Sequence, residues 1–362
     1  MSGPRDPVRF ACPLPSAAND RVVLGHGSGG KLTADLIGSI FLPALQNPVL
    51  AKLNDQAVIG VNGARLAFTT DTFVVKPLVF PGGDIGSLAV HGTINDLAVG
   101  GARPLCLSAA FVIEEGFSLE LLRRLVNSLA AAAEAAGTPV VTGDTKVVER
   151  GGCDGLFITT SGIGVLDDGV DLSCEYARPG DRILLSGSIG DHGIAVLGER
   201  EGFDFESAVR SDSAALHTLT AAMLRASAPH RAGDAAPGPI RTMRDPTRGG
   251  VASALNEIAG KAGVGVELEE TAILVREEVR GACELLGLDP LYVANEGKLV
   301  AIVAPAAAAA VLRAMQGHPL GREARDIGCM TDEHPGVVTM RTTLGTRRLV
   351  EMLSGDQLPR IC

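Results

Sequence analysis

The sequence predicts an α/β (α+β) protein with two domains and a mobile C-terminal tail. Its 362 residues are more than one hydrophobic core usually holds, which favours two domains. Strand-like and helix-like segments alternate through both halves, and "EYARPGD" (175–181) marks a junction between them. The stretch "LSGDQLPRIC", which ends at Cys362, has no periodic apolar pattern. We expect an N-terminal arm with a glycine-rich loop (1–40), an N-terminal domain (41–170), a C-terminal domain (171–345) and a tail (346–362).

In the first half, apolar runs bounded by glycine and polar residues predict strands, and three-to-four apolar spacing predicts helices. The segment "SLELLRRLVNSLAAAAEAAG" shows that spacing and ends at Gly137, as a helix should. A helix is also expected after the glycine-rich loop, within 31–45. The predicted strands are 65–75, 104–113, 140–148 and 156–166, with helices at 86–101 and 118–137.

The second half repeats this alternation loosely. The predicted strands are 182–190, 264–270 and 291–305, with two more near 322–330 and 336–343. The predicted helices begin near His192 and cover 247–263, 276–287 and 306–317. Two α/β units of similar size follow from this pattern.

Composition excludes several classes of function. The net charge of −10 opposes binding to a phosphate backbone, and the absence of Trp leaves few platforms for base stacking. No apolar run approaches the roughly 18 residues of a membrane span, and the first residues do not resemble a signal peptide. Seven scattered cysteines without a CxxC pair suit neither a disulfide framework nor a zinc site. We therefore expect a cytoplasmic protein that binds neither nucleic acid nor membrane.

The glycine-rich stretch "GHGSGGKL" (25–32) nearly matches a P-loop. Leu32 occupies the position where a P-loop needs a hydroxyl for Mg²⁺, so a P-loop nucleotidase is disfavoured. Backbone N–H groups at such a loop still attract anions, with Lys31 beside them. A flexible connection without a ligand is the alternative.

Several aspartates lie among glycine, threonine and apolar residues, where an uncompensated carboxylate is costly. Each one alone suits a helix cap or a turn, but together they favour a site for a divalent cation and a nucleotide. They are Asp55, Asp71, Asp96, Asp144 and Asp245.

The motifs around these acids resemble a known superfamily. "NDQAV", "TTD", "HGTINDLAVGGARP", "GDTKVV" and "DPTRGG" follow the order seen in the ATP-binding superfamily of aminoimidazole ribonucleotide synthetase and selenophosphate synthetase. "GHGSGGK", "SGSIGDHGIAVL", "VANEGK" and "PRIC" narrow the resemblance to the HypE family of hydrogenase-maturation carbamoyl dehydratases. The match runs from about Val22 to Cys362 and implies the two-domain aminoimidazole ribonucleotide synthetase-like fold.

The resemblance also implies a reaction and its partners. A carbamoyltransferase, HypF, places a carbamoyl group on the terminal cysteine. ATP with Mg²⁺ then drives dehydration to a thiocyanate, and the cyanide passes through a HypC–HypD scaffold to the iron of a [NiFe] hydrogenase. A homodimer is implied as well. The tail of 17 residues from Thr346 spans at most roughly 55–60 Å when extended, enough to visit both a partner and the ATP site.

The resemblance assigns roles residue by residue. Cys362 carries the group, while Glu296 and Lys146 handle the carbamoyl nitrogen protons; for Lys146, a counter-charge to phosphate is equally open. His192, in "GDHG", is interpreted as structural. The implied Mg²⁺ and phosphate acids are Asp55, Asp71, Asp96 and Asp245, and the implied nucleotide residues are Gly27, Ser28, Gly29, Gly30, Lys31, Asn95, Gly143, Asp144 and Thr145.

Two alternatives stay open. One is another synthetase of the same superfamily, producing selenophosphate or aminoimidazole ribonucleotide. Selenophosphate synthetases carry Cys or selenocysteine in the glycine-rich loop, which has no cysteine here. The other is a non-catalytic assembly scaffold that senses nucleotide and docks partners through its tail.

Overall fold

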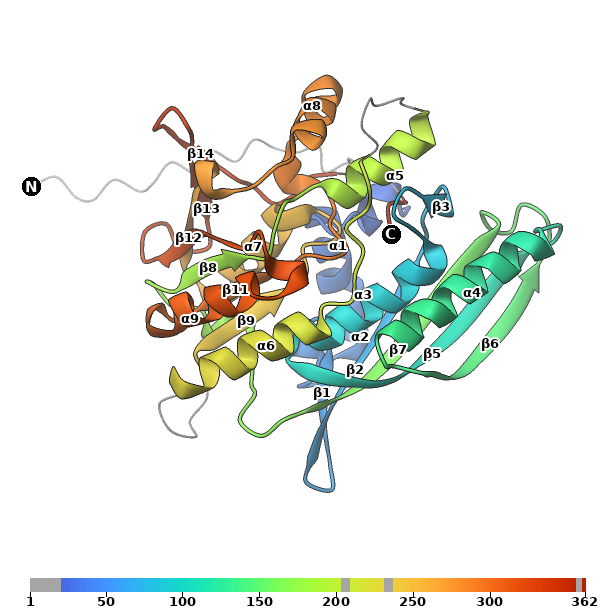
Figure 1. Ribbon diagram of the computed structural model, residues 1–362, viewed down its shortest axis with the longest axis horizontal. Helices are drawn as coiled ribbons and strands as arrows, with labels where there is room; N and C mark the ends of the chain where they lie inside the picture. The colour runs from blue at the N-terminus through green and yellow to red at the C-terminus, as the bar shows by residue number, and fades with distance from the viewer. Residues whose placement is uncertain (1–20, 203–208, 231–236, 356–359) are drawn as a thin grey trace, which may run out of the picture.

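The computed structural model describes residues 21–202, 209–230, 237–355 and 360–362. Within these residues, one sheet belongs to the first half of the chain and a second, larger sheet to the second half (Figure 1). The five-stranded N-terminal sheet has the order β1-β2-β7-β5-β6, and the seven-stranded C-terminal sheet has the order β14-β13-β10-β12-β8-β11-β9. The predicted α/β class is confirmed.

The N-terminal sheet is covered on one face by two helices, α3 and α4 (Figure 1). Helix α3 begins where the Asp84 carboxylate accepts hydrogen bonds from the N–H groups of Gly86 and Ser87. The helix packs tightly on the sheet because a Cβ at Gly92 would lie 2.8 Å from the Phe73 ring. The strands are β1 (Ala57–Val61), β2 (Ala64–Phe73), β5 (Ala102–Glu114), β6 (Val140–Val148) and β7 (Leu156–Leu166), with α3 (Ile85–Val99), α4 (Leu119–Ala135) and the short pair β3 (Val79–Phe80) and β4 (Gly83–Asp84).

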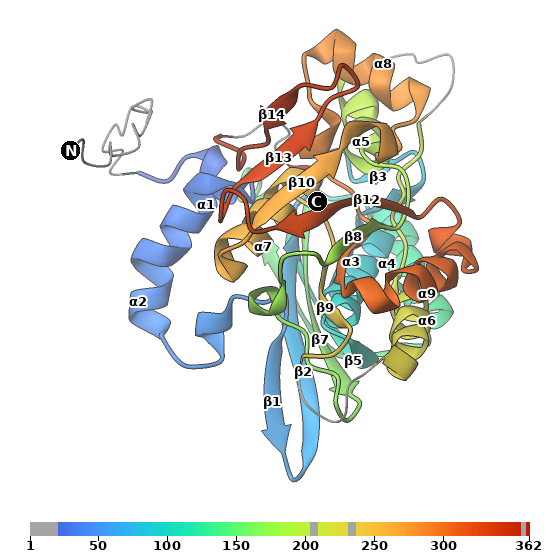
Figure 2. The same cartoon turned by 90° about the vertical axis from the view of Figure 1, so that its left-hand side faces the viewer.

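The opposite face of this sheet, which we call the open face, exposes apolar side chains. Ile59, Phe68 and Ile163 are 45 %, 41 % and 38 % exposed, and Phe68 pairs directly with Ile163 across β2 and β7. Before the sheet, a helical segment leads away from the body of the molecule (Figure 2). Its parts, with the short turns beside it, are η1 (Leu24–Gly27), α1 (Lys31–Leu36), η2 (Ile37–Phe41), α2 (Leu42–Leu45) and η3 (Leu50–Lys52).

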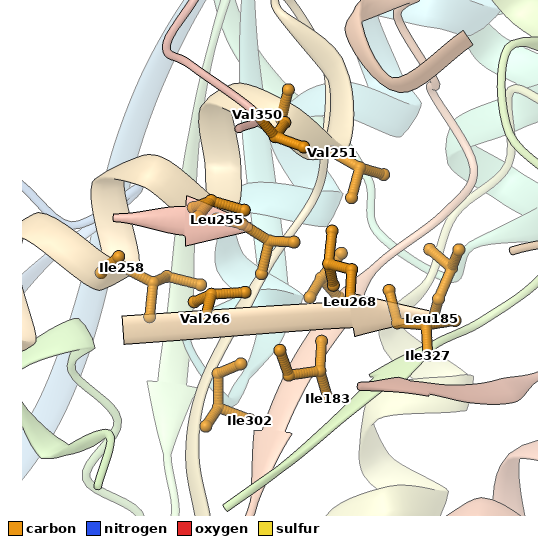
Figure 3. Close-up of a cluster of buried hydrophobic side chains, with 14 of the residues drawn as sticks. Ile183, Leu185, Val251, Leu255, Ile258, Val266, Leu268, Ile302, Ile327 and Val350 are labelled. Atoms are coloured by element: carbon orange, nitrogen blue, oxygen red, sulfur yellow. The ribbon is translucent and has the colours of Figure 1, made fainter. Parts of the chain in front are cut away.

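Strands β8 and β11 of the C-terminal sheet are buried on both faces because their side chains alternate between two cores. Ile183 and Leu185 of β8 face helix α7, whereas Leu184 between them faces helices α6 and α9. Figure 3 shows the α7 side, where Leu255 packs among side chains of β8, β10 and β11. The strands are β8 (Arg182–Leu185), β9 (Ile240–Arg244), β10 (Gly265–Glu269), β11 (Val300–Val303), β12 (Arg325–Thr331), β13 (Val338–Arg341) and β14 (Arg347–Leu349).

The helices of this half connect the strands. They are α5 (Asp191–Glu201), α6 (His217–Ser227), α7 (Gly250–Ala262), α8 (Glu277–Leu286) and α9 (Pro305–Gln316), with the turns η4 (Cys174–Tyr176), η5 (Ala228–His230), η6 (Glu270–Ala272), η7 (Pro290–Tyr292) and η8 (Pro319–Gly321).

The structure corrects four expectations. The predicted strand 291–305 is confirmed only for Val300–Val303, because 291–299 form a turn and a loop that carries Glu296. Helix α6 was not predicted. The helical segment from Lys31 to Leu45 is continuous, so the boundary at residue 40 cuts through it. The tail predicted from 346 begins instead with β14, which pairs with β13, and with Val350, which is buried in the α7 core.

We expect Leu255→Ala to lower the free energy of unfolding by about 2–5 kcal/mol, because Leu255 is fully buried and its removal leaves a cavity. Leu285→Ala on α8 is the matched control, since Leu285 is 74 % exposed and should change stability by less than about 0.5 kcal/mol. Urea unfolding, followed by a probe in the C-terminal domain, measures both. Equal effects of the two substitutions would contradict this packing.

Candidate functional site

Three carboxylates from distant parts of the sequence meet at the junction of the two domains. Asp55 precedes β1, Asp96 lies near the end of α3, and Asp245 directly follows β9. Oxygen atoms of these three side chains all lie within 4.8 Å of one another. The structure therefore brings together three of the four acids that the sequence predicted for a metal.

Burial and repulsion raise the pKa of two of these carboxylates, Asp96 and Asp245. Burial, followed by the charges of Asp245 and Asp71, raises the pKa of Asp96 well above its ordinary value, against a 2.7 Å hydrogen bond from the Thr69 hydroxyl. Burial likewise raises the pKa of Asp245 to about 6. Such a group binds a cation readily, because a cation relieves the repulsion that the proton otherwise relieves.

The fourth predicted acid, Asp71, lies on β2 beside this cluster without joining it. Its Oδ1 accepts a 2.8 Å hydrogen bond from the N–H of Thr72. Burial raises the pKa of Asp71, and the Arg248 guanidinium opposes the shift. Asp71 raises the pKa of both Asp96 and Asp245, so it contributes charge to the same place. We call the group of Asp55, Asp71, Asp96 and Asp245 the acidic pocket.

Two arginines balance part of this charge. Arg244, at the end of β9, forms an ion pair with Asp55 and donates a 2.7 Å hydrogen bond to Glu257 on α7. Arg248 lies in the loop before α7. The charge of Cys362 is the largest cause that raises the pKa of Arg248, and burial opposes it. Arg248 also donates to the carbonyl of Gly27 at 3.1 Å, which ties the glycine-rich loop to the acidic pocket.

Glu296 is held in this pocket by two asparagines. Asn295 donates from its side chain to the carbonyl of Pro246 at 3.0 Å and accepts from the N–H of Gly190 at 2.8 Å. Asn95 on α3 donates to the carbonyl of Glu296 at 3.1 Å. The loop of Glu296 is thus fixed between both domains, beside the segment that carries Asp245.

The carboxyl group of Glu296 is buried and faces the thiol of Cys362. Burial, then the charges of Asp245 and Asp71, raises the pKa of Glu296 well above its ordinary value. Among the residues that the structure describes, Oε1 of Glu296 has no hydrogen-bond partner. A buried acceptor without a donor is costly, so this oxygen is suited to receive an N–H group from a molecule bound here.

Cys362 lies at the inner end of the docked tail. Residues 360–362 run antiparallel to 74–76. The N–H of Val74 donates to a main-chain oxygen of Cys362, and the N–H of Lys76 donates to the carbonyl of Arg360, both at 3.1 Å. Burial raises the pKa of the Cys362 thiol; Arg248 opposes this, while the charge of Glu296 and a hydrogen bond to it add to the rise. In this position the thiol stays protonated and is a poor nucleophile.

The glycine-rich loop is pressed against both Arg248 and the C-terminal segment. A Cβ at Gly29 would lie 2.8 Å from the carbonyl oxygen of Arg248, and one at Gly30 would lie 2.2 Å from that of Leu353. Lys31 donates its N–H to the same Leu353 oxygen at 2.8 Å, and the hydroxyl of Ser28 donates to Gly25 at 2.9 Å. Close packing therefore explains two of these glycines, and nucleotide contacts of the loop remain a prediction.

Asn95 was predicted to line the nucleotide, but its amide is engaged within the protein. Besides the Glu296 carbonyl, it donates to Ala214 at 3.0 Å and accepts from the N–H of Leu216 at 2.8 Å. These bonds give Asn95 a positioning role for the Glu296 loop.

The structure does not bring Lys146 to the acidic pocket of the same chain. Asp71, Thr160, Ala109 and Gly143 form one row across β2, β7, β5 and β6, so Gly143 is three strands, about 14 Å, from Asp71. Side chains alternate along a strand, which places Lys146 on the open face and Asp71 on the helix-covered face. Lys146 pairs at 3.1 Å with the exposed carboxylate of Asp144.

The predicted residues Gly143, Asp144 and Thr145 instead line a cavity of about 1110 Å³ between β6 and α4. Asp144 is exposed to solvent. The hydrogen bond from Lys146, followed by the one from the N–H of Thr145, lowers the pKa of Asp144. The contact of these three residues with a nucleotide stays a prediction.

Sequence reasoning missed Arg248 and Asn295 as site residues. Both lie inside motifs that carried the resemblance, "DPTRGG" and "VANEGK", beside predicted site residues. Their place beside predicted site residues was the available signal. Only the fold shows that the Arg248 guanidinium interacts with Cys362 and that Asn295 bonds to Pro246.

In the described part of the chain, no helix has the length and apolar character needed to cross a membrane. The donor set of the acidic pocket fits Mg²⁺, because carboxylate oxygens are its preferred protein ligands and three of them lie within reach of one ion. The pocket therefore combines a candidate metal site, a thiol and a buried acid.

Comparison with known proteins supports this description. Residues 53–166 and 178–341 match the N-terminal and C-terminal domains of AIR synthase related proteins. The chain is 57 % identical to carbamoyl dehydratase HypE of Cupriavidus necator over 343 residues, which cover 94 % of this chain and 95 % of the relative.

Solved structures agree. A HypE–HypF complex matches with a TM-score of 0.81 and 45 % identity, covering 88 % of this chain and 99 % of that chain. A hydrogenase maturation protein HypE in complex with ATP matches with a TM-score of 0.77 and 47 % identity, covering 94 % of this chain and 100 % of that chain. The chain therefore belongs to the HypE family, within the AIR synthase related proteins.

Proposed function

We propose that this protein uses ATP to dehydrate an S-carbamoyl group on Cys362 to a thiocyanate, which supplies cyanide for [NiFe] hydrogenase maturation. The observation that carries the proposal is the placement of the Cys362 thiol against Glu296 and Arg248, next to the acidic pocket. The carbamoyl dehydratase name of the relatives and the ATP-bound HypE structure support it.

In the proposed reaction the carbamoyl oxygen leaves as part of phosphate. The γ-phosphoryl group of ATP bonds to that oxygen as its bond to ADP breaks, and the nitrogen loses its first proton. The C–O bond then breaks with release of phosphate, and the second nitrogen proton leaves as the C≡N bond forms. One of these protons goes to Glu296 and the other to the departing phosphate. The products are the thiocyanate of Cys362, ADP and phosphate. Arg248 stabilises charge that develops next to the sulfur, and Oε1 of Glu296 accepts a proton from the carbamoyl nitrogen.

Asp55, Asp96 and Asp245 would hold Mg²⁺, which when bound supplies neutralisation of the phosphate charge. Asp71 adds negative charge from β2, which strengthens cation binding at the same place. The glycine-rich loop lies against this pocket through the Arg248–Gly27 hydrogen bond, so its N–H groups are near where phosphates would lie.

We further propose a homodimer in which the open faces of two N-terminal sheets meet. The exposed apolar residues Ile59, Phe68 and Ile163 support this, as does the position of Lys146 on the same face. In this arrangement Lys146 of one copy serves the acidic pocket of the other. The proposed partners are HypF, which carbamoylates Cys362 and is supported by the HypE–HypF structure, and a HypC–HypD complex that accepts cyanide.

Glu296→Gln is expected to bind ATP, accept the carbamoyl group and stop there. Loss of the proton acceptor should slow dehydration about 10²–10⁴-fold. Mass spectrometry of the C-terminal peptide, after incubation with HypF, carbamoyl phosphate and ATP, should show carbamoylated Cys362 without the loss of water seen in the wild type. Glu120→Gln, at an exposed position on α4, is the control and should dehydrate normally. Full turnover of Glu296→Gln would remove Glu296 from this role.

Asp245→Asn should stabilise the metal-free protein at neutral pH. The raised pKa of Asp245, about 6, means that the folded state binds a proton more tightly than the unfolded chain, so this group's destabilisation grows as pH rises through about 4 to 6. In EDTA, the Tm of the variant should exceed that of the wild type at pH 7.5, and the difference should shrink at pH 5. Mg²⁺ should raise the Tm of the wild type only. An unchanged Tm difference across pH would contradict the assignment.

Mixing two inactive variants tests the shared site. Lys146→Ala and Glu296→Ala chains are each expected to be inactive alone. If Lys146 of one copy serves the other copy's pocket, random mixing restores about one quarter of the wild-type activity, because half of the dimers then hold one intact site. Chains carrying Phe68→Glu as well should stay monomeric by light scattering and show no restoration. No recovery from a mixture proven to contain heterodimers would overturn the arrangement.

A further inference from the structure

The docked tail depends on a contact that the reaction described above does not use. The main-chain oxygens of Arg360 and Cys362 accept hydrogen bonds from the N–H groups of Lys76 and Val74, respectively. The carbonyl of Ile361 between them receives no such backbone hydrogen bond in the described part of the chain. Docking therefore leaves one backbone acceptor that needs a separate donor.

His192, at the start of α5, is that donor. Its Nε2 lies 2.8 Å from the carbonyl oxygen of Ile361, and its ring is fully buried. A carbonyl oxygen only accepts, so Nε2 carries the hydrogen. Burial lowers the pKa of His192, which keeps the ring neutral, and its Nδ1 is then an acceptor.

Two neighbours fix this ring. The hydroxyl of Ser211 lies 2.8 Å from Nδ1 of His192 and donates to it, which selects the tautomer that bonds the tail. The ring of Phe80 meets His192 edge-on, with centroids 5.4 Å apart. The side chain of Ile361, 2 % exposed, packs in the same apolar cluster as Phe80 and Val196 of α5. The ring is oriented before the tail arrives, because Ser211 and Phe80 lie outside the tail.

We infer that His192, oriented by Ser211, is the positioning residue that holds the tail inward and sets Cys362 against Glu296. It acts through the main chain of Ile361 and touches no reacting atom. The consequence for catalysis rests on the proposed function, whereas the docking itself does not. This contact adds to the hydrogen bond from Arg200 to the Arg360 carbonyl and to the Arg360–Asp154 ion pair. Its loss shifts the balance from the docked tail toward a released tail in which the thiol is free to react.

Alkylation of Cys362 measures the released population without ATP, HypF or a carbamoyl group. Iodoacetamide should modify Cys362 about 5- to 100-fold faster in His192→Leu than in the wild type, since the Ile361 carbonyl then docks without a donor. His192→Gln keeps an N–H at the position of Nε2 and should restore slow modification. Ser211→Ala leaves the tautomer unselected and should give an intermediate rate. Cys329 on β12, half-buried and in another part of the fold, reports general loosening and should react at the wild-type rate in all variants.

In carbamoylated protein, His192→Leu should lower the single-turnover rate of water loss and leave the KM for ATP unchanged. A wild-type rate of Cys362 alkylation in both His192→Leu and Ser211→Ala would overturn the inference. If His192→Leu also speeds alkylation of Cys329, the result for Ser211→Ala decides. Faster alkylation of Cys362 alone in Ser211→Ala supports the contact, and an unchanged rate at Cys362 refutes it. If the wild type never loses water from its carbamoyl group, the proposed function fails while the alkylation result still stands on its own.

Discussion

Repulsion among buried carboxyl groups is the constraint on which the rest of this site depends. Burial is the largest cause that raises the pKa of Asp96, Asp245 and Glu296, and the charge of Asp71 raises all three further. Arg244 and Arg248 offset part of this negative charge. A cation bound among these acids, as we propose, would lessen their repulsion.

This constraint explains why both domains are needed. Asp96 and Asn95 come from α3 of the first domain, whereas Asp245 and Glu296 come from loops of the second. Neither set alone forms the acidic pocket. Asn95 lies on α3 and bonds through its side chain to Ala214 and Glu296 of the second domain, which holds the two sets in register. A change at the domain junction therefore acts on the chemistry directly, because it alters the spacing of the acids.

The elements of the fold and the acids could largely be predicted from sequence, because each depends on local pattern or on a motif. Helix α4 follows from its apolar spacing, and Asp96 and Asp245 follow from their glycine and threonine neighbours. Asp55 follows from the motif "NDQAV". The loop of Glu296 was predicted as a strand, since "LYVAN" is apolar enough for one; its asparagine instead bonds to Pro246 far away in sequence. Likewise, His192 was visible in its motif, but its partner Ile361 is 169 residues away. The position of Lys146 could not be predicted for the same reason. The face of the sheet on which it lies depends on how β6 pairs with β5, and the local sequence does not specify that pairing.

The tail has to allow both loading of Cys362 with a carbamoyl group and dehydration of that group, and burial favours only the dehydration. Docking lowers the reactivity of Cys362, because removal from water and the Glu296 charge keep the thiol protonated. Under the proposed function, acceptance of the carbamoyl group needs the thiolate, so we expect it to occur while the tail is released. Once carbamoylated, the sulfur carries no proton to lose, and the same burial then excludes water from a group that must lose its oxygen to phosphate and not to hydrolysis. The pocket is thus unsuited to loading the cysteine and suited to dehydrating its cargo, and this separation makes a reversible contact at Ile361 more useful than a permanent one.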